Sequence, residues 1–499
     1  MQIYKKKVLY LLIRKTFNFV SMLENYIEEQ ILQNLKFPPT KGQKILAKKL
    51  STYVNKNSYR SAFLLKGYAG TGKTSMLSAL VKTLDQSEIL SVLMAPTGRA
   101  AKVMTSYIGK PAFTIHKVIY RQKSSSDGMG KFVLGLNKNK DTFFIVDESS
   151  MISNRTEGGS SFGTGHLLDD LYEYIYSGHR CKLILVGDTA QLPPVGMDIS
   201  PALEPNELEQ YGLDVDEFEL TDVVRQSLDA GILYNATEIR KILSVTNDHF
   251  KYFPIKIDSF TDIFRISGAE LTEKISDCYD RFGEQQTMVV TRSNKRANRF
   301  NQGIRSTILY KEEQITKGDL LMVVKNNYFW LKEEKKADFI ANGDIVEVKA
   351  IHGYEELYGF HFANVTLCFF DYDNLEIDCK IILDTMNIET SSMTREDNSK
   401  LYYAVAEDYA EITTKKKRWE KIRENPYFNA LQVKFAYAVT CHKAQGGQWQ
   451  SVFIDQGYLV PDMMTKEYLR WLYTAFTRPV KELYLVNFNK DFFGGEEIQ

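Results

Sequence analysis

The stretch from Gly67 to Thr74 constrains the fold of this chain more than any other part of the sequence. It reads G-x-x-x-x-G-K-T, and it stands between an apolar run at 62–65 and a helix-compatible run at 75–84. A strand, a glycine-rich loop and a helix in this order are the context of a phosphate-binding loop. The glycines let backbone N–H groups turn inward around phosphate oxygens, and the following helix directs its positive end at the same anion. The sequence therefore predicts a nucleotide-binding α/β domain.

The end of this loop is predicted to contact a nucleotide and its metal ion through Gly70, Thr71, Gly72, Lys73 and Thr74. Lys73 is expected to reach the β and γ phosphates, and the Thr74 hydroxyl to ligate Mg²⁺. The competing interpretation is a glycine-rich turn that binds nothing. The full spacing and the flanking context disfavour that interpretation.

Gln43 lies upstream of the loop and has two interpretations. It stands three residues after Thr40, so its side chain can cap the start of the helix that follows. Its amide also offers a donor and an acceptor, which is the pattern needed to pair with the edge of an adenine. Its position just before a phosphate-binding loop favours the adenine contact.

Two further buried strands end in polar residues that suit nucleotide chemistry. The apolar run at 142–146 ends in Asp147 and Glu148, and the run at 182–186 leads to Gln191. Ligands of α/β sheets bind at the carboxyl ends of the strands. Asp147 is therefore predicted to hold Mg²⁺ through its water shell, Glu148 to orient and deprotonate the attacking water, and Gln191 to sense the γ-phosphate. A helix start enriched in acids is the alternative interpretation of Asp147 and Glu148.

The size and charge of the chain limit the remaining possibilities. Its 499 residues predict two to four domains. Lys plus Arg and Asp plus Glu both number 63, so a globally basic nucleic-acid binder is not indicated, whereas a local basic groove is compatible with the composition. The five cysteines contain no C-x-x-C pair, which supports neither a zinc site nor a disulfide framework and favours a reducing cytoplasm.

Residues 1–22 are expected to be either an extension upstream of the true start at Met22 or a disordered tail. A basic run at 5–7 precedes an apolar run at 8–13. The apolar run is too short for a secretory signal or a membrane span, so no membrane association is predicted.

The second half of the chain carries fewer local motifs. Residues 121–140 are polar and rich in glycine and serine, which predicts a short hairpin or a mobile excursion. From 316 to 424 the apolar period changes to two, which predicts a small β-barrel or sheet inserted in the α/β chain. The basic run at 415–418, followed by Trp419, fits single-strand contact or a solvated face, and the solvated face is favoured. The α/β pattern is expected to resume with a strand at 431–439.

Nine blocks in a fixed order resemble the motifs of superfamily 1 helicases, specifically of the RecD/Dda-like branch with a UvrD-type C-terminal helicase domain. The blocks are Gln43, 67–74, 95–102, 114–116, 147–149, 187–194, Arg225, 437–446 and 473–478. The resemblance covers roughly residues 37–490 and is loose within the region of period two.

The resemblance implies an α/β fold with two RecA-like P-loop NTPase domains and ATP in the cleft between them. Residues 23–225 would form the first domain, with a short β-hairpin pin at about 121–140. Residues 226–315 and 425–499 would form the second domain, and residues 316–424 an inserted SH3-like β domain.

The resemblance also implies roles that the residues alone do not assign. Arg225 and Arg478 would act as arginine fingers on the γ-phosphoryl group, and Gly446 would contact the nucleotide. Phe132 in the pin would be a wedge against the terminal base pair. Single-stranded DNA would be contacted by six further residues of the two α/β domains, namely Thr97, Lys102, His116, Thr440, His442 and Lys443.

The implied function is the ATP-dependent separation of duplex DNA by 5′→3′ movement along one strand, with ATP and Mg²⁺ as cofactors. The expected partners of a monomeric protein are single-stranded and forked DNA, with a single-strand-binding or recombination protein as a further candidate. Two alternatives stay open: a DNA-stimulated ATPase subunit of an exonuclease or recombination complex, and a nucleotide-gated binding protein without motor activity. The blocks at 440–446 and 473–478 argue against the last, because a simple switch needs no second domain to complete its site.

Overall fold

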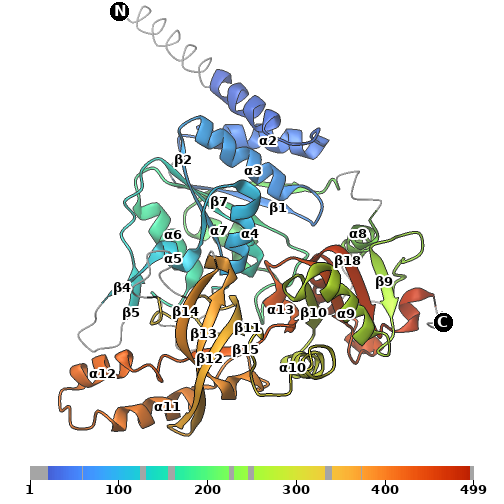
Figure 1. Ribbon diagram of the computed structural model, residues 1–499. Coiled ribbons are helices and arrows are strands. Elements are labelled where there is room, and N and C mark those ends of the chain that lie inside the picture. Colours follow the sequence, from blue (N-terminus) through green and yellow to red (C-terminus); the bar gives the residue numbers. More distant parts are fainter. Residues whose placement is uncertain are drawn as a thin grey trace, which may run out of the picture.

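The computed structural model describes residues 21–58, 60–123, 131–154, 163–223, 230–244, 252–331, 340–372 and 374–494 of the chain. These residues form two parallel α/β sheets and a closed β-barrel (Figure 1). None of the helices within these ranges is both long and apolar enough to cross a membrane. Residues 1–20 lie outside the described part of the chain, so the expectation for the segment at 1–22 stays a prediction.

The first α/β domain is built on a six-stranded sheet in the order β3-β2-β6-β7-β1-β8, in which every neighbouring pair is parallel. Its strands are β1 (Ser61–Gly67), β2 (Leu90–Ala95), β3 (Ala112–Thr114), β6 (Thr142–Val146), β7 (Lys182–Gly187) and β8 (Asp214–Leu220). Its helices are 21–33, α2 (Lys41–Asn55), α3 (Lys73–Gln86), α4 (Gly98–Ile108), α5 (Ile115–Ile119), α6 (Leu167–Ser177) and α7 (Pro205–Gln210).

Helices cover both faces of this sheet, because successive residues of a strand point to opposite sides. In β1, Phe63 and Leu65 belong to the apolar cluster that includes α2 and α3, whereas Ala62 and Leu64 belong to the cluster that includes α5 and α6. All four side chains are buried. Burial on both faces explains why the central strands are continuous apolar runs in the sequence. It leaves the carboxyl ends of the strands as the edge where polar residues gather.

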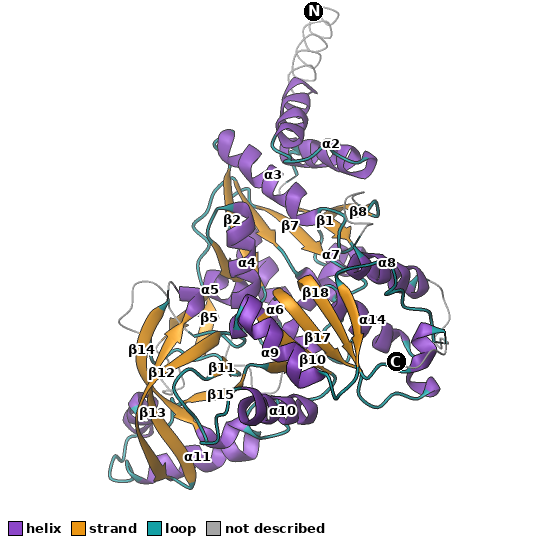
Figure 2. Cartoon of the chain, turned by 45° about the vertical axis from the view of Figure 1, so that its right-hand side comes forward, coloured by secondary structure: helices purple, strands orange, loops and turns teal. Residues whose placement is uncertain are grey.

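The second α/β domain has a five-stranded parallel sheet in the order β16-β10-β17-β18-β9. Its strands are β9 (Ile263–Ile266), β10 (Thr287–Thr291), β16 (Ala438–Thr440), β17 (Trp449–Asp455) and β18 (Pro479–Val486). Its helices are α8 (Gly231–Leu243), α9 (Leu271–Phe282), α10 (Asn294–Gly303), α13 (Cys441–Ala444) and α14 (Lys466–Phe476). Figure 2 shows this sheet beside the first, with the barrel on the side away from α2 and α3.

The barrel is a closed SH3-like set of five strands inserted in the second domain. Its strands are β11 (Leu320–Val323), β12 (Ile345–Leu357), β13 (Phe360–Phe369), β14 (Leu375–Ile382) and β15 (Leu431–Phe435). Strand β15 closes it by pairing with β14 in parallel and with β11 in antiparallel orientation. The predicted architecture of two RecA-like domains with an inserted β domain is confirmed.

The predicted strand at 431–439 is wrong in one respect. The structure divides it into β15, which belongs to the barrel, and β16, which belongs to the second sheet. Both pieces are apolar, so composition alone does not show that the chain changes partners at Ala436 and Tyr437. The barrel therefore extends beyond residue 424, where the sequence placed its end.

The inserted segment also holds two helices that the period-two pattern did not predict. They are α11 (Arg395–Glu407) and α12 (Lys415–Glu424), and they pair as a helical hairpin. A capping box between Thr394 and Asp397 starts α11, and this start was readable in the sequence.

The excursion predicted at 121–140 contains a hairpin. Strand β4 (Tyr120–Lys123) pairs with β5 (Lys131–Leu134) in antiparallel register, with Gln122 opposite Phe132. The residues at 124–130, between the two strands, lie outside the described part of the chain.

Candidate functional site

The phosphate-binding loop has the predicted strand–loop–helix form. It leaves β1 at Gly67, and α3 begins at Lys73 with Gly72 as its N-cap. Gly70 and Gly72 have φ of +74° and +85°, a region that glycine adopts without strain. Lys73 donates from Nζ to the carbonyl oxygen of Tyr68 at 2.9 Å. The Lys73 side chain therefore bonds to a carbonyl oxygen of the loop itself, whereas the sequence predicted that it would contact phosphate oxygens.

Gln43 performs the capping role and also contacts the loop. Its backbone N–H donates to Thr40 Oγ1 at 3.2 Å, and its side-chain oxygen accepts from the Thr40 N–H at 3.0 Å. Its amide nitrogen donates to the carbonyl oxygen of Thr71 at 3.2 Å. The capping interpretation is confirmed, and Gln43 ties helix α2 to the loop. The adenine contact stays a prediction.

Asp147 and Glu148 follow β6 at the same edge of the sheet. Burial raises the pKa of Asp147 to about 7, the negative charge of Glu148 adds to this rise, and the charge of Lys73 opposes it. Glu148 adopts a left-handed backbone, with φ of +52°, and its N–H donates to Asp147 Oδ1 at 2.8 Å. Such a backbone is unfavourable for a residue other than glycine and is often found at functional sites.

The residues at this edge fit Mg²⁺ in their chemistry. Mg²⁺ prefers oxygen ligands and keeps several waters, so one carboxylate, one hydroxyl and phosphate oxygens suffice. Asp147 offers the carboxylate, and the Thr74 hydroxyl on the first turn of α3 has no hydrogen-bond partner in the described ranges. A divalent cation would also hold Asp147 ionised against its raised pKa.

The loop after β7 is held between the two α/β domains. The Leu192 N–H donates to Thr474 Oγ1 at 2.8 Å, and the Leu192 carbonyl accepts from Gln445 Nε2 at 2.7 Å. Gln191 beside them is buried, and its Oε1 has no hydrogen-bond partner among the described residues. A buried amide oxygen in this state is costly unless a ligand or water reaches it, which fits the predicted γ-phosphate sensor.

Tyr473 of α14 joins the second domain to the phosphate-binding loop of the first. Its hydroxyl accepts from the Ala69 N–H at 2.8 Å and donates to Asp188 Oδ2 at 2.7 Å. The same Asp188 oxygen lies 3.8 Å from Nζ of Lys73. The Tyr473 side chain is fully buried, and burial raises the pKa of its hydroxyl well above the ordinary value. One hydroxyl therefore links the loop, the carboxylate beside Lys73 and the second domain.

Replacing Tyr473 with phenylalanine is expected to destabilise the nucleotide-free protein by about 1–3 kcal/mol, because the Ala69 N–H and the Asp188 carboxylate lose their partner. A nucleotide would give the Ala69 N–H a new acceptor. We therefore expect Mg²⁺ and a non-hydrolysable ATP analogue to raise the thermal midpoint more in Tyr473→Phe than in the wild type. Tyr468→Phe is the matched control, since Tyr468 is buried on the same helix and its hydroxyl is unpartnered within the described ranges. Identical behaviour of both variants would contradict this role.

Helix α8 covers the loop from the second domain. A Cβ atom on Gly70 would lie 2.5 Å from Cδ2 of Leu233, so a larger residue there would require the Leu233 side chain to move. The guanidinium of Arg240 lies 4.4 Å from the ring centre of Tyr68. Its buried Nη1 finds no hydrogen-bond partner in the part of the chain that the structure describes. Helix α8 carries no sequence motif, so its residues were missed.

Of the two predicted arginine fingers, the structure describes Arg478, which donates hydrogen bonds within the second domain. Arg478 is buried and donates to the carbonyl oxygens of Thr474 and Gly447, at 3.0 and 3.2 Å, and to Thr477 Oγ1 at 2.9 Å. These acceptors all belong to the second domain. Arg225 lies outside the described residues. Both roles stay predictions.

Gly446 lies against α4 of the first domain. A Cβ atom on it would be 2.9 Å from Cβ of Ala100 and 3.4 Å from Oγ1 of Thr97. This glycine, with φ of +72°, therefore permits a close approach of the two domains. Its predicted nucleotide contact stays untested.

The predicted DNA residues of the first domain lie on α4 and α5. Thr97 is the N-cap of α4 and accepts from the Ala100 N–H at 3.2 Å. Lys102 is exposed and donates from Nζ to the carbonyl oxygen of Phe370 in the barrel at 2.8 Å. Burial lowers the pKa of His116 to about 4, so this side chain is neutral near pH 7 and brings no charge to a phosphate.

The predicted DNA residues of the second domain stand where β16 ends. Thr440 is the N-cap of α13, and burial lowers the pKa of His442. Lys443 donates from Nζ to Asn342 Oδ1, in a turn of the barrel, at 2.6 Å. Lys102 and Lys443 thus reach the barrel from two different domains, and the structure brings the three parts together where the strand was expected to lie.

The buried His116 predicts a pH dependence of stability. Its folded pKa of about 4 lies below the ordinary 6.5, so the unfolded chain binds the extra proton and stability is lost as the pH falls from about 6.5 towards 4. Between pH 7 and pH 5 this one group accounts for at most about 2 kcal/mol. We expect His116→Gln to show a smaller loss of unfolding free energy between these pH values than the wild type, measured by denaturant titration. Parallel losses in both proteins would contradict the assignment.

Phe132 of the pin is half-buried and packs against the barrel. Its ring lies 4.2 Å from the ring of Tyr328, measured between centroids. It stands at the second residue of β5, opposite Gln122 and near the end of the paired strands that leads to the connection at 124–130. Its role as a wedge stays a prediction, because 124–130 between the strands are not described.

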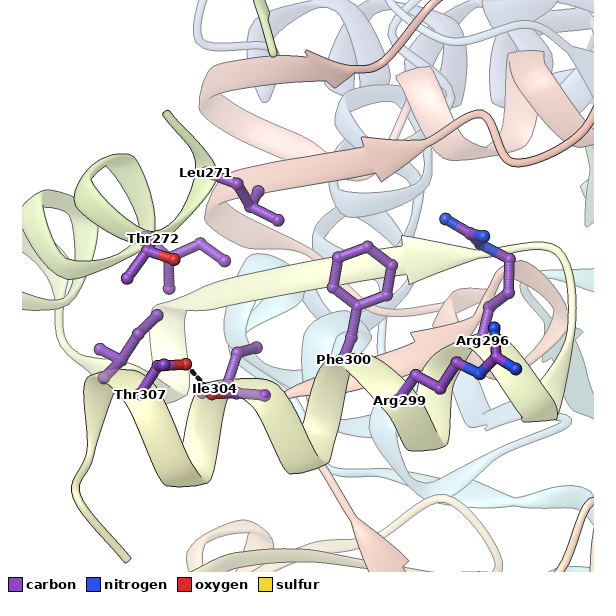
Figure 3. A pocket seen from close by; sticks show the side chains of 10 residues that line it. Leu271, Thr272, Arg296, Arg299, Phe300, Ile304 and Thr307 are labelled. Carbon is purple, nitrogen blue, oxygen red and sulfur yellow. Dashed lines mark hydrogen bonds between the residues drawn. The ribbon is translucent and has the colours of Figure 1, made fainter. Parts of the chain in front are cut away.

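A separate cavity of about 250 Å³ lies between α9 and α10. Figure 3 shows Leu271 and Thr272 facing Phe300, Ile304 and Thr307 across it, with Arg296 and Arg299 at one end. None of the residues predicted to bind nucleotide or DNA lines it.

Two family models match the chain, one in its N-terminal half and one near its C-terminal end. The AAA domain matches residues 40–241, and the UvrD-like helicase C-terminal domain matches residues 435–486. The first range contains the phosphate-binding loop and the acidic pair, and the second contains α13 and α14.

Relatives and solved structures are similar at low identity. An uncharacterized protein of Acanthamoeba polyphaga mimivirus is 25% identical, and the match covers 88% of this chain and 98% of that protein. The ATP-dependent DNA helicase Dda of Enterobacteria phage T4 is 24% identical over 52% of this chain and 55% of its own length. The ATP-dependent RecD2 DNA helicase of Deinococcus radiodurans is 28% identical over 32% of this chain, which spans only 19% of that protein. A Bacteroides Pif1 helicase with ADP-AlF3 and single-stranded DNA has a TM-score of 0.46 at 14% identity, covering 92% of this chain and 94% of that one.

The described geometry and the family matches agree on one assignment. The phosphate-binding loop contacts the second α/β domain through Tyr473, and both family domains occur in sequence order. The chain belongs to the superfamily 1 helicases, in the branch that includes RecD and Dda.

Proposed function

We propose that this protein is an ATP-dependent DNA helicase that moves 5′→3′ along single-stranded DNA and separates duplex DNA. The observation that carries the proposal is the contact of Tyr473 with the Ala69 N–H and with Asp188. It joins the nucleotide loop of one α/β domain to a helix of the other. A nucleotide that rearranges the loop must therefore act on the contact between the domains, which is the requirement for a motor.

The nucleotide chemistry is assigned to residues of the cleft. Lys73 exchanges its contact with the Tyr68 carbonyl for phosphate oxygens, and Glu148 orients and deprotonates the attacking water. Thr74 and Asp147 would hold Mg²⁺, which would supply positive charge to the phosphate oxygens. Gln191 accepts a hydrogen bond through its free amide oxygen, and Arg478 and Arg225 approach when the cleft closes on ATP.

The path of the single strand is assigned to the boundary between the α/β domains and the barrel. Lys102 and Lys443 would exchange their present contacts with Phe370 and Asn342 for phosphates. Thr97 and Thr440, at helix starts, add hydroxyl and N–H groups, while neutral His116 and His442 contribute hydrogen bonds or stacking. Such contacts read the backbone, so binding is expected to tolerate any sequence and to weaken with salt.

The proposal is tested by strand separation on three duplexes of the same sequence: one with a 5′ tail, one with a 3′ tail and one with blunt ends. We expect ATP to drive separation of the 5′-tailed duplex alone, and a non-hydrolysable analogue to drive none. Separation of the 3′-tailed duplex alone would overturn the direction. ATP hydrolysis without separation of any duplex would favour an ATPase subunit that works only within a larger complex.

A further inference from the structure

Three neighbouring lysines on the helical hairpin of the inserted domain make no hydrogen bond or ion pair with the described part of the chain. Lys415, Lys416 and Lys417 form the first turn of α12, and all three are exposed. None makes a hydrogen bond or ion pair with any residue in the described ranges. The acidic side chains nearest in sequence, Glu411 and Glu420, form no ion pair with them. In a chain with 63 residues of each charge, these three cations form a local patch, named here the α12 lysine patch.

Two other basic residues of α12 have partners within the protein. Arg418 donates to the carbonyl oxygens of Ala410 and Ile412, both at 3.0 Å, and Lys421 pairs with Glu424 at 3.0 Å. The three lysines stand instead at the positive end of the helix, and Thr414 makes no side-chain capping bond there. Like charges at this end are mildly unfavourable by a few tenths of a kcal/mol each. Helix stability therefore does not account for the α12 lysine patch.

The single aromatic residue of this basic run faces inward. Trp419 packs against Tyr402 of α11 and against Phe428, with ring centres 5.3 and 5.9 Å away. Ile422 on the same side of the helix is fully buried. The Trp419 ring therefore packs within the hairpin and is not available to stack on an unpaired base. The exposed face of α12 therefore carries positive charge but no aromatic ring on which a base could stack. Such a surface suits the phosphate backbone of DNA whose bases are paired.

Helix α12 is fixed beside the pin through a short series of contacts. Phe132 of the pin packs on Tyr328, and the neighbouring Asn327 donates from Nδ2 to the carbonyl oxygen of Asn429 at 2.8 Å. Asn429 in turn donates from Nδ2 to the carbonyl oxygen of Arg423, in the last turn of α12, at 2.8 Å. Figure 1 shows α12 below β4 and β5 at the same edge of the molecule. The hairpin that is proposed to divide the strands and helix α12 with its lysine patch therefore lie at one corner of the molecule.

We propose that the α12 lysine patch binds the phosphate backbone of the duplex arm of a fork, ahead of the pin. This inference rests on the proposed function, because it takes β4 and β5 as the place where the strands part. The single strand is assigned to Lys102 of α4 and Lys443 of α13, which contact the barrel at Phe370 and Asn342, whereas the patch lies on α12. Duplex DNA carries one charge per about 1.7 Å of its axis, which makes it a polyanion suited to three adjacent lysines.

The test compares the triple variant K415Q/K416Q/K417Q with the triple variant K44Q/K48Q/K82Q. The control lysines are exposed on α2 and α3, at the opposite end of the molecule, and their replacement changes the net charge equally. Binding of a blunt duplex, a 5′-tailed fork and a single strand is measured by fluorescence anisotropy, without nucleotide, over a series of salt concentrations. Thermal unfolding of each variant verifies that it is folded.

We expect the α12 variant to bind the duplex and the fork about tenfold more weakly and the single strand with unchanged affinity. The slope of log affinity against log salt for the duplex should fall by about 0.9 for each phosphate group that the variant no longer neutralises. Equal weakening by the control variant, equal weakening for the single strand, or unchanged duplex binding would each overturn the inference. The last outcome would favour an acidic protein surface as the occupant. A wild type that binds no single strand would instead refute the proposed function itself.

Discussion

Replacing Lys73 with alanine or Glu148 with glutamine is expected to lower the rate of ATP hydrolysis by about a thousandfold, for a different reason in each variant. Lys73 is the cation of the phosphate-binding loop, so its loss weakens nucleotide binding as well as hydrolysis. Glu148 is assigned to the attacking water, and removal of a general base typically costs a factor of about 10² to 10⁴. Glu148→Gln is therefore expected to keep nucleotide affinity within about threefold of the wild type.

Steady-state hydrolysis and the binding of a fluorescent ATP analogue measure this difference. Lys82→Ala is the matched control, because Lys82 is exposed on the same helix α3 as Lys73 and is expected to leave both quantities unchanged. Substantial hydrolysis by Glu148→Gln would contradict the assignment of Glu148 as the general base and would indicate that another acidic residue has this role.

Replacing Asp319 with alanine is expected to destabilise the protein by about 3–5 kcal/mol, the usual effect of removing one partner from a buried ion pair. Asp319 is fully buried and accepts from Nε and Nη2 of Arg305, at 3.1 and 2.9 Å. It also accepts from the Thr316 N–H at 2.8 Å and from the Tyr437 hydroxyl at 3.1 Å. Its loss would leave the buried guanidinium of Arg305 without a counter-charge.

This network lies where the chain passes between the second α/β domain and the barrel. Arg305 follows α10, Asp319 precedes β11, and Tyr437 separates β15 from β16, so both passages are tied to one carboxylate. Asp378→Ala is the control, because Asp378 is an exposed barrel residue, for which a change below about 1 kcal/mol is expected. The measurement is the free energy of unfolding from denaturant titration. Equal effects of both variants would show that the network does not stabilise this junction.

The first domain could be predicted from the sequence because its signals are local. The apolar runs, Gly67 to Thr74, and the acids after β6 each specify their own element within about ten residues. Parallel strands bring their carboxyl ends to one edge of a sheet. This rule alone was enough to predict that Lys73, Asp147 and Gln191 lie at the same edge.

Other features depend on contacts between distant segments, which a single sequence does not carry. The strand at 431–435 resembles its neighbour at 438–440 in composition, and only the pairing with β14 and β11 assigns it to the barrel. Tyr473 stood within a recognised block, but its role requires Ala69 and Asp188, which lie 404 and 285 residues away. Arg240 lies on a helix without any motif, so no pattern pointed to it.

Gln43 has two structural roles, and only one of them was among the interpretations that the sequence offered. The capping box and the contact with Thr71 are local and distant uses of the same side chain. The sequence offered the cap as one of two interpretations, and the structure confirms it. The second use depends on the loop folding back onto α2, which sequence spacing does not encode.

The central claim is that the cleft hydrolyses ATP in response to DNA, and the most direct test is steady-state ATP hydrolysis by the wild type with and without single-stranded DNA. We predict that the single strand raises the rate by about tenfold or more, because DNA held by residues of both domains favours the closed cleft. The stimulation should decline as the salt concentration rises. A rate that is the same with and without DNA at every salt concentration would contradict the account.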